Sequence, residues 1–191
     1  LAFPSTFQFV RMFHCCRPIN TDSYYSDGIR VLDFANAQFT KTILGDPAFP
    51  QITAAHLQTA FDEMLHSYMR NGYVYFGLDD RYVAKHGHDY RNKGSEYAQS
   101  LAVVVDREHG ADMAAYLTTQ GQPTIFEVKI PVNDFGDQAI RELAPNVLFA
   151  WAFNVAHESR TPYHIDFSVE LDRDLLPDFI IRHYNPNEMR A

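Results

Sequence analysis

Residues 7–15 read FQFVRMFHC, and this segment, rich in Phe and Val, is typical of a β-strand. A period of two places these residues on two faces: Phe7, Phe9, Arg11 and Phe13 on one, and Gln8, Val10, Met12 and His14 on the other. The strand therefore ends close to a histidine. The next residues, Cys15-Cys16-Arg17-Pro18, lead into a turn.

Two later segments show the same alternation. Residues 124–131 (TIFEVKIP) predict a half-buried strand, and residues 163–171 (YHIDFSVEL) carry the clearest pattern in the chain. In the second segment one face carries Tyr163, Ile165, Phe167, Val169 and Leu171, and the other carries His164, Asp166, Ser168 and Glu170. Residues 73–77 and 179–183 predict two shorter strands.

Helical patterns lie between these strands. Residues 53–70 give the clearest helix, and residues 94–106 predict another that Ser95 would cap. A short helix is expected over 21–28, and part of 138–154 is expected to be helical, whereas 32–52 reads as irregular. Strands and helices follow in no regular βαβ order, so the predicted fold class is α+β.

The length of 191 residues and mass of 22.0 kDa favour a single domain over residues 1–191. A net charge of −8 provides no overall basic footprint for nucleic acid. No apolar run approaches the roughly 18 residues of a membrane span, so we expect no membrane partner. Two adjacent cysteines, Cys15 and Cys16, indicate free thiols in a reducing compartment, and hence the cytoplasm.

Several familiar sites have no support in the sequence. His86-Gly87-His88 with His66 lacks the ligand spacing of common metal centres, so we expect no metal site. Neither a nucleophile elbow nor a phosphate-binding glycine loop occurs. A nucleophilic Cys15 or Cys16 beside His14 would lack a recognisable third member.

Four features could carry chemistry, and each also has a purely structural interpretation. His14 could bind a sugar hydroxyl and Arg17 a phosphate, or both could border an ordinary turn. Tyr75, in the segment Val74-Tyr75-Phe76, could stack on a flat ring or fill the core. Glu96 could face a ligand or merely stabilise the first turn of its helix.

The fourth feature is the polar face of residues 163–171. Asp166 and Glu170 could stabilise positive charge on a sugar carbon, as carboxylates do in glycosyl transfer. The alternative is that this face is the solvated side of an edge strand.

In this order, the four features resemble the ADP-ribosyltransferase fold of the histidine–tyrosine–acid group, which includes the poly(ADP-ribose) polymerases and the diphtheria-type toxins. The group has a strand-terminal His, a Gly-hydrophobic pair and a Tyr within an apolar-Tyr-Phe strand. It ends with an acid about thirteen residues before a final apolar strand. The corresponding residues here are His14, Gly28-Ile29, Val74-Tyr75-Phe76 and Asp166 before Phe179. The chain also resembles a loosely defined set of uncharacterised bacterial proteins of this type that share Gly-Ser-Glu-Tyr and Pro-Thr-Ile-Phe.

The resemblance implies a split, mixed or antiparallel sheet with flanking helices, and NAD bound as substrate in a cleft between the half-sheets. His14 would bind the adenosine-side ribose and Tyr75 would stack on nicotinamide. The implied NAD-binding residues also include Cys15, Arg17, Gly28 and Phe76. An acid would stabilise the oxocarbenium ion, and the candidates are Asp166, Glu170 and Glu96.

One departure from the group narrows the activity that the resemblance implies. The aligned acid is Asp166, where the group usually has Glu, and this favours mono-ADP-ribosyl transfer over chain elongation. The implied protein is a bacterial toxin, effector or phage-defence enzyme with a protein or nucleic-acid target. A cognate antitoxin or immunity protein is an expected partner, and the site of action is the cytoplasm, of this cell or of a target cell.

Two other functions remain open. One is a transferase of the same fold that modifies RNA or DNA, which predicts a basic groove formed by Arg81, Lys85, Arg91 and Lys93. The other is a binding module of this fold that lacks enzymatic activity, for which the Asp at position 166 is the main support.

Overall fold

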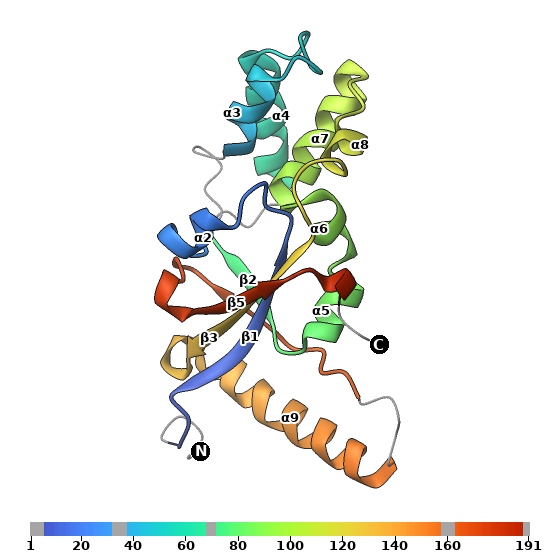
Figure 1. The fold of residues 1–191 in the computed structure, drawn as a ribbon. Coiled ribbons are helices and arrows are strands. Elements are labelled where there is room, and N and C mark those ends of the chain that lie inside the picture. The colour runs from blue at the N-terminus through green and yellow to red at the C-terminus, as the bar shows by residue number, and fades with distance from the viewer. Residues whose placement is uncertain (1–5, 32–37, 68–71, 158–162, 189–191) are drawn as a thin grey trace.

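A computed structural model describes residues 6–31, 38–67, 72–157 and 163–188. Its centre is a five-stranded sheet with the order β4-β2-β1-β3-β5, in which every pairing is antiparallel (Figure 1). The strands are β1 (Phe9–Cys16), β2 (Val74–Gly77), β3 (Thr124–Pro131), β4 (Ser168–Leu171) and β5 (Ile180–Tyr184). Helices flank the sheet, which confirms the predicted α+β class.

The central strand β1 contacts its two neighbours very differently. It pairs with β3 over eight consecutive positions, from Phe9 opposite Pro131 to Cys16 opposite Thr124. Its register with β2 is a single pair, Phe13 opposite Gly77. Beyond that pair β1 and β2 separate, so the sheet consists of a β1-β3-β5 part and a β2-β4 part that share one junction.

The two faces of the sheet are covered by different helices. Met12, Phe76 and Phe126 belong to a core that includes residues of α2 (Asp22–Asp27) and α9 (Asp137–His157). On the other face, Phe13, Cys15 and Ile125 pack against α5 (Asp80–His86). The alternation predicted for residues 7–15 thus places both faces of β1 in contact with helices.

A second core lies in a helical layer at one end of the sheet (Figure 1). It is formed by α3 (Gln38–Gly45), α4 (Ala54–Ser67), α7 (Glu96–His109) and α8 (Met113–Leu117). Leu101, Ala102, Val105 and Met113 are fully buried there. A short helix, α6 (His88–Lys93), links α5 to this layer.

Several sequence predictions are confirmed closely. The strand predicted over 124–131 is β3, residue for residue. The Ser95 hydroxyl accepts a hydrogen bond from the Ala98 amide at 3.2 Å and caps α7, as predicted. The helix predicted over 53–70 is observed as α4 to Ser67, and residues 68–70 lie outside the described residues.

Other predictions are wrong, and tertiary contacts explain the largest error. Only Ser168–Leu171 of the predicted strand 163–171 is a strand, because its partner β2 ends at Gly77. The Ile165 amide instead donates to the carboxylate of Asp79, which caps α5. The segment predicted as irregular contains α3, and α5, α6 and α8 were not predicted.

The remaining differences are smaller. The final strand is β5, which begins at Ile180 after a 3₁₀ turn over Pro177–Phe179. The helix expected in part of 138–154 is α9, which spans 21 residues and contains Pro145. In the described part of the chain, no helix is both long and apolar enough to cross a membrane.

Candidate functional site

His14 and Tyr75, which are 61 residues apart in sequence, meet where β1 and β2 separate. The Nδ1 atom of His14 lies 2.9 Å from the backbone oxygen of Tyr75. A carbonyl oxygen only accepts hydrogen bonds, so Nδ1 must carry the proton and Nε2 is left as an acceptor. Because the separated strands leave the Tyr75 carbonyl without a backbone donor from β1, the His14 ring satisfies it.

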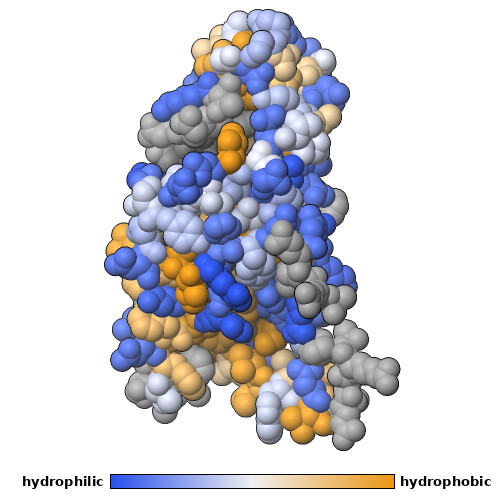
Figure 2. All heavy atoms as spheres, viewed as in Figure 1, coloured by the Kyte–Doolittle hydropathy of each residue, from blue (hydrophilic) through white to orange (hydrophobic). Residues whose placement is uncertain are grey.

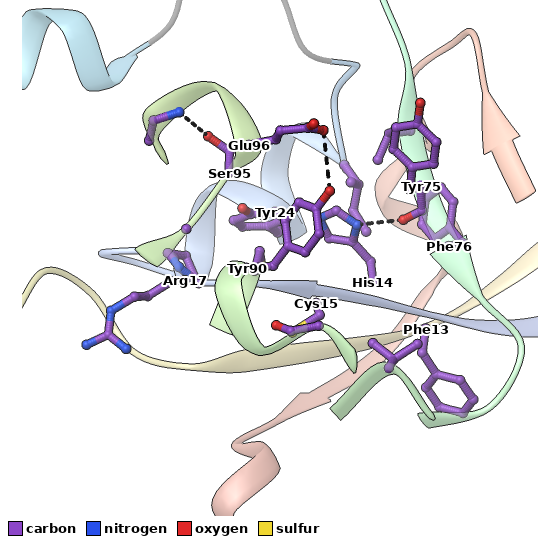
Figure 3. Close-up of a pocket in the computed structure, with 18 of the residues that line it drawn as sticks. Phe13, His14, Cys15, Arg17, Tyr24, Tyr75, Phe76, Tyr90, Ser95 and Glu96 are labelled. Carbon is purple, nitrogen blue, oxygen red and sulfur yellow. Dashed lines mark hydrogen bonds between the residues drawn. The ribbon is translucent and has the colours of Figure 1, made fainter. Parts of the chain in front are cut away.

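Both residues line a cavity of about 1110 Å³ (Figure 3). Its walls come from the end of β1, from β2, from α2 and the residues after it, and from the segment that runs from α5 to the start of α7. Among the residues named by sequence analysis, the lining includes His14, Cys15, Arg17, Gly28, Tyr75, Phe76 and Glu96. The site predicted from separate segments is therefore largely assembled in one place.

His14 is neutral in this environment at physiological pH. Burial lowers its pKa below the ordinary value of 6.5, and the hydrogen bond to Tyr75 opposes this only in part. Its ring packs at a tilt against Phe76, with centroids 5.5 Å apart. A neutral, oriented imidazole with a free acceptor nitrogen is suited to bind a hydroxyl group.

The two cysteines point to opposite faces of β1, because side chains alternate along a strand. Both are free, and burial raises the pKa of Cys15 to about 11 and of Cys16 to about 12. Cys16 is hydrogen-bonded to the Tyr24 hydroxyl, and Cys15 lies beside the Gly87 carbonyl. Thiols with such pKa values are protonated at neutral pH, so neither has the character of a catalytic nucleophile.

Arg17 is held by backbone carbonyls. Its guanidinium donates to the carbonyl oxygens of Gln120, Arg91 (3.1 Å) and Thr118 (2.6 Å). The side chain points away from Tyr75 and Glu96 (Figure 3). These three hydrogen bonds use three of the five N–H groups of the guanidinium. Arg17 could therefore bind a phosphate only through the other two.

Gly28 has a structural requirement of its own. Its φ is +85°, and a Cβ at this position would lie 2.1 Å from the Leu175 oxygen. This close approach lets Ile29 and Leu175 exchange two backbone hydrogen bonds, of 2.9 and 2.8 Å. This bridge between Ile29 and Leu175 holds the chain that follows α2 against the segment that follows β4.

Glu96 is the first residue of α7 and lines the cavity. The Tyr90 hydroxyl donates to its Oε2 at 3.4 Å, and burial with the nearby Glu96 charge raises the pKa of Tyr90 to about 12. Figure 3 shows this pair beside His14 and Tyr75. The sequence alone left Glu96 between capping and function, and the structure places its carboxylate at the cavity.

Asp166 and Glu170 occupy other positions. Asp166 precedes β4 and accepts a hydrogen bond from Tyr82, whose ring lines the cavity. Glu170 lies in β4 opposite Tyr75. Neither carboxylate is part of the cavity lining, in which Asp27 and Glu96 are the acidic residues among those described.

Sequence analysis missed an aromatic wall of the cavity. Tyr82, His86 and Tyr90 line it at four-residue intervals along α5 and α6, and the rings of Tyr82 and His86 stack with centroids 4.2 Å apart. The spacing of Tyr82 and His86 was a usable signal, since residues four apart on one helix share a face, whereas Tyr90 lies on the next helix. It was overlooked because the two short helices were not predicted.

The basic groove predicted for a nucleic-acid-modifying enzyme stays a prediction, and its four residues, Arg81, Lys85, Arg91 and Lys93, lie on α5 and α6. Arg81 pairs with Asp79 at 2.9 Å, and Arg91 donates to the Ala84 carbonyl. Lys93 lines the cavity but lies 3.7 Å from Asp89. Within the described ranges, no three His, Cys, Asp or Glu side chains gather as a metal site.

Comparison with known proteins does not identify a family for this chain. No family model, no curated protein and no solved structure matches the chain.

Proposed function

We propose that this protein is an NAD-dependent mono-ADP-ribosyltransferase that modifies a cellular macromolecule. One observation carries the proposal: His14 and Tyr75 meet on the wall of a large cavity that opens where the sheet divides. The resemblance in sequence implies an NAD cleft at such a division. The cavity, at about 1110 Å³, is slightly larger than the roughly 300–1,000 Å³ of typical small-molecule sites, which suits a dinucleotide.

Two kinds of group in the cavity support the proposal that it binds NAD. The Nε2 of neutral His14 can accept a hydrogen bond from a ribose hydroxyl. The rings of Tyr75, Tyr82, His86 and Tyr90 provide flat surfaces for the electron-poor nicotinamide ring and for adenine.

In the proposed reaction, the bond between ribose C1′ and the nicotinamide nitrogen breaks, and its electron pair leaves with neutral nicotinamide. The ribose becomes an oxocarbenium ion, which a nearby carboxylate stabilises. An oxygen or nitrogen of the acceptor then forms a bond to C1′ and loses its proton.

Three carboxylates are candidates for this role. Glu96 lines the cavity directly, and Asp166 lies outside the lining but is hydrogen-bonded to Tyr82, which lines it. Glu170, opposite Tyr75, is the third candidate. Neutralising the carboxylate that stabilises the oxocarbenium ion should reduce turnover by about 100-fold or more while NAD still binds.

The test is NAD binding by calorimetry together with nicotinamide release, with cell-extract proteins and RNA both supplied as acceptors. Glu96→Gln, Asp166→Asn and Glu170→Gln are compared with Asp172→Asn, an exposed carboxylate just after β4. Failure of the unaltered protein both to bind NAD and to release nicotinamide would overturn the proposal. Full activity in all three carboxylate variants would overturn the assigned mechanism.

A further inference from the structure

Among the described residues, helix α5 covers only one end of the sheet face on which it lies. There, Phe13, Cys15 and Ile125 pack against it. Toward the other end, Arg11 and Lys129 are opposite each other in the β1–β3 register and so lie on the same face as Phe13. The Arg11 side chain is 68% exposed, and Lys129 is exposed as well. This half of the face is therefore open to solvent.

The open sheet face, defined as Phe9, Arg11, Glu127, Lys129 and Arg182, carries more positive than negative charge. Arg182 of β5 is opposite Glu127 of β3, and its side chain is 66% exposed. Glu127 is buried, with its oxygens 3.6 Å from Arg11 and 2.7 Å from Arg182. One carboxylate cannot balance three cations, so this surface is positive although the chain has a net charge of −8. Figure 2 shows strongly hydrophilic side chains over the part of the sheet where β1 and β5 lie in Figure 1.

Each cation of the open sheet face lies over an aromatic ring. The charged group is 5.7 Å from the ring centroid for Arg11 over Phe13, 5.7 Å for Lys129 over Phe9 and 5.5 Å for Arg182 over Tyr184. Phe9 is 43% exposed, so part of its ring is accessible to a further flat group. Surfaces that bind single-stranded nucleic acid combine these two elements, because cations contact the phosphates and bases stack on the rings.

A second cavity, of about 510 Å³, lies at the β5 end of this face. Tyr184 lines it and also lies under Arg182. Asn20, Gln122 and Asn185 line this amide pocket too, and its described lining contains no Lys, Arg, Asp or Glu. Asn20 and Asn185 accept backbone hydrogen bonds through Oδ1, so their NH₂ groups remain as donors. Primary amides without a neighbouring charge are suited to the edge of a nucleobase rather than to a phosphate.

We propose that this protein binds single-stranded nucleic acid along the open sheet face, with one base in the amide pocket. In this arrangement Arg11, Lys129 and Arg182 contact phosphates, and another base stacks on Phe9. A double helix could not use the rings, because its bases are already stacked on one another. An acidic peptide would match the cations but has no base for the amide pocket.

The proposed surface is separate from the large cavity. None of the five residues of the open sheet face lines that cavity. The amide pocket shares residues 18–20 with it, so a bound strand would lie beside the cavity. Binding is therefore measured without NAD, and its outcome does not depend on whether the protein transfers ADP-ribose.

The test is the fluorescence anisotropy of a labelled single strand of about 10 nucleotides, titrated with the unaltered protein. Three phosphate contacts predict that the affinity falls about 20-fold between roughly 50 and 200 mM NaCl. A strand of the same length with abasic sites keeps the phosphates but offers no bases, and it should bind about 10-fold more weakly. Lack of binding at the lower salt concentration, or equal affinity for the two strands, would overturn the proposal.

The charge on the open sheet face is tested by Lys129→Glu, which removes a phosphate contact and should weaken binding by about 10-fold or more. The matched control is Lys41→Glu, the same reversal at an exposed lysine of α3, in the helical layer. It should bind as the unaltered protein does, and circular dichroism checks the folding of both variants. Should Lys129→Glu fail to fold, Lys129→Gln provides the same test with an expected loss of about 5-fold.

The contacts to bases are tested by Phe9→Ala and Gln122→Ala. Each should weaken binding of the intact strand by about 5-fold or more, and binding of the abasic strand much less. Equal affinities of Lys129→Glu and Lys41→Glu would contradict the assigned surface. Polyglutamate that displaces the labelled strand as well as an unlabelled strand does would replace nucleic acid by an acidic protein partner.

Discussion

The two sides of β1 show how one strand supports both stability and a site. Toward β3 its backbone groups pair over eight positions, and its inward side chains join a continuous core. Toward β2 it makes one pair and then leaves a gap, where the Tyr75 carbonyl accepts from a histidine side chain instead. We therefore expect the pairing side to provide most of the rigidity, whereas on the open side polar groups and rings line the cavity.

The largest predicted effect lies on the β3 side. Phe126 is fully buried and stacks on Tyr24, with centroids 4.4 Å apart. Phe126→Ala should lower the free energy of unfolding by about 3–5 kcal/mol, because it removes buried surface and leaves a cavity. Urea denaturation measures this, and Val103→Ala on the surface should change it by less than about 0.5 kcal/mol. A loss below 1 kcal/mol for Phe126→Ala would contradict the proposed rigidity of this side.

Gly28→Ala is expected to have the next largest effect, on the open side. A Cβ there cannot coexist with the Leu175 oxygen, so the bridge to Ile29 should break at a cost of about 2 kcal/mol. Gly45→Ala is the control, since nothing lies within 4 Å of its Cβ position and alanine favours helix α3. Equal stability of the two variants, measured by thermal and urea unfolding, would show that the bridge is unimportant.

A smaller, pH-dependent effect should come from His14. Since burial lowers its pKa in the folded state, the unfolded chain binds more protons below about pH 6.5. The contribution of His14 to stability is therefore complete above that pH and is lost as the pH falls through the folded pKa. His14→Gln should flatten the acid side of the stability profile, as measured by urea unfolding between pH 5 and pH 8. Parallel profiles for the two proteins would contradict the lowered pKa.

The smallest effect is expected from Tyr90→Phe. Its hydrogen bond to Glu96 is long, at 3.4 Å, and partly exposed, so stability should change by less than about 1 kcal/mol. If Glu96 acts on the substrate, turnover should fall several-fold while NAD affinity changes less, because the carboxylate loses its orientation. Tyr25→Phe is the control, because it removes an exposed tyrosine hydroxyl that is hydrogen-bonded to His183 and lies outside the cavity lining. An unchanged turnover would remove Tyr90 from the functional site.

The predictions from sequence succeeded where a local pattern determined the structure. The alternation in 124–131 and the serine cap of α7 needed no distant partner. The strand predicted over 163–171 failed because a strand needs a neighbour, and β2 is only four residues long. Helices α5, α6 and α8 are seven residues or fewer, too short for a helical period to be clear.

The same distinction between local pattern and distant contact applies to the candidate site. The sequence identified His14, Tyr75 and Glu96 one by one, each with a purely structural alternative that was favoured for His14 and Tyr75. Their presence on one cavity depends on the separation of β1 from β2 and on the turn that carries α6 into α7. The role of Arg17 also depends on contacts with Arg91, Thr118 and Gln120, which lie far from it in the sequence.

By itself, the sequence determined the α+β class, the two faces of β1 and the residue types available for chemistry, because alternation, capping and composition are local properties. The tertiary structure alone decided that the sheet divides at Phe13 and Gly77 and that a neutral His14 donates to Tyr75 there. It also decided which carboxylate lines the cavity and that Leu148, Trp151 and Val155 of α9 are exposed among the described residues. These features follow from which segments pack together, and burial and pairing between distant residues set that choice.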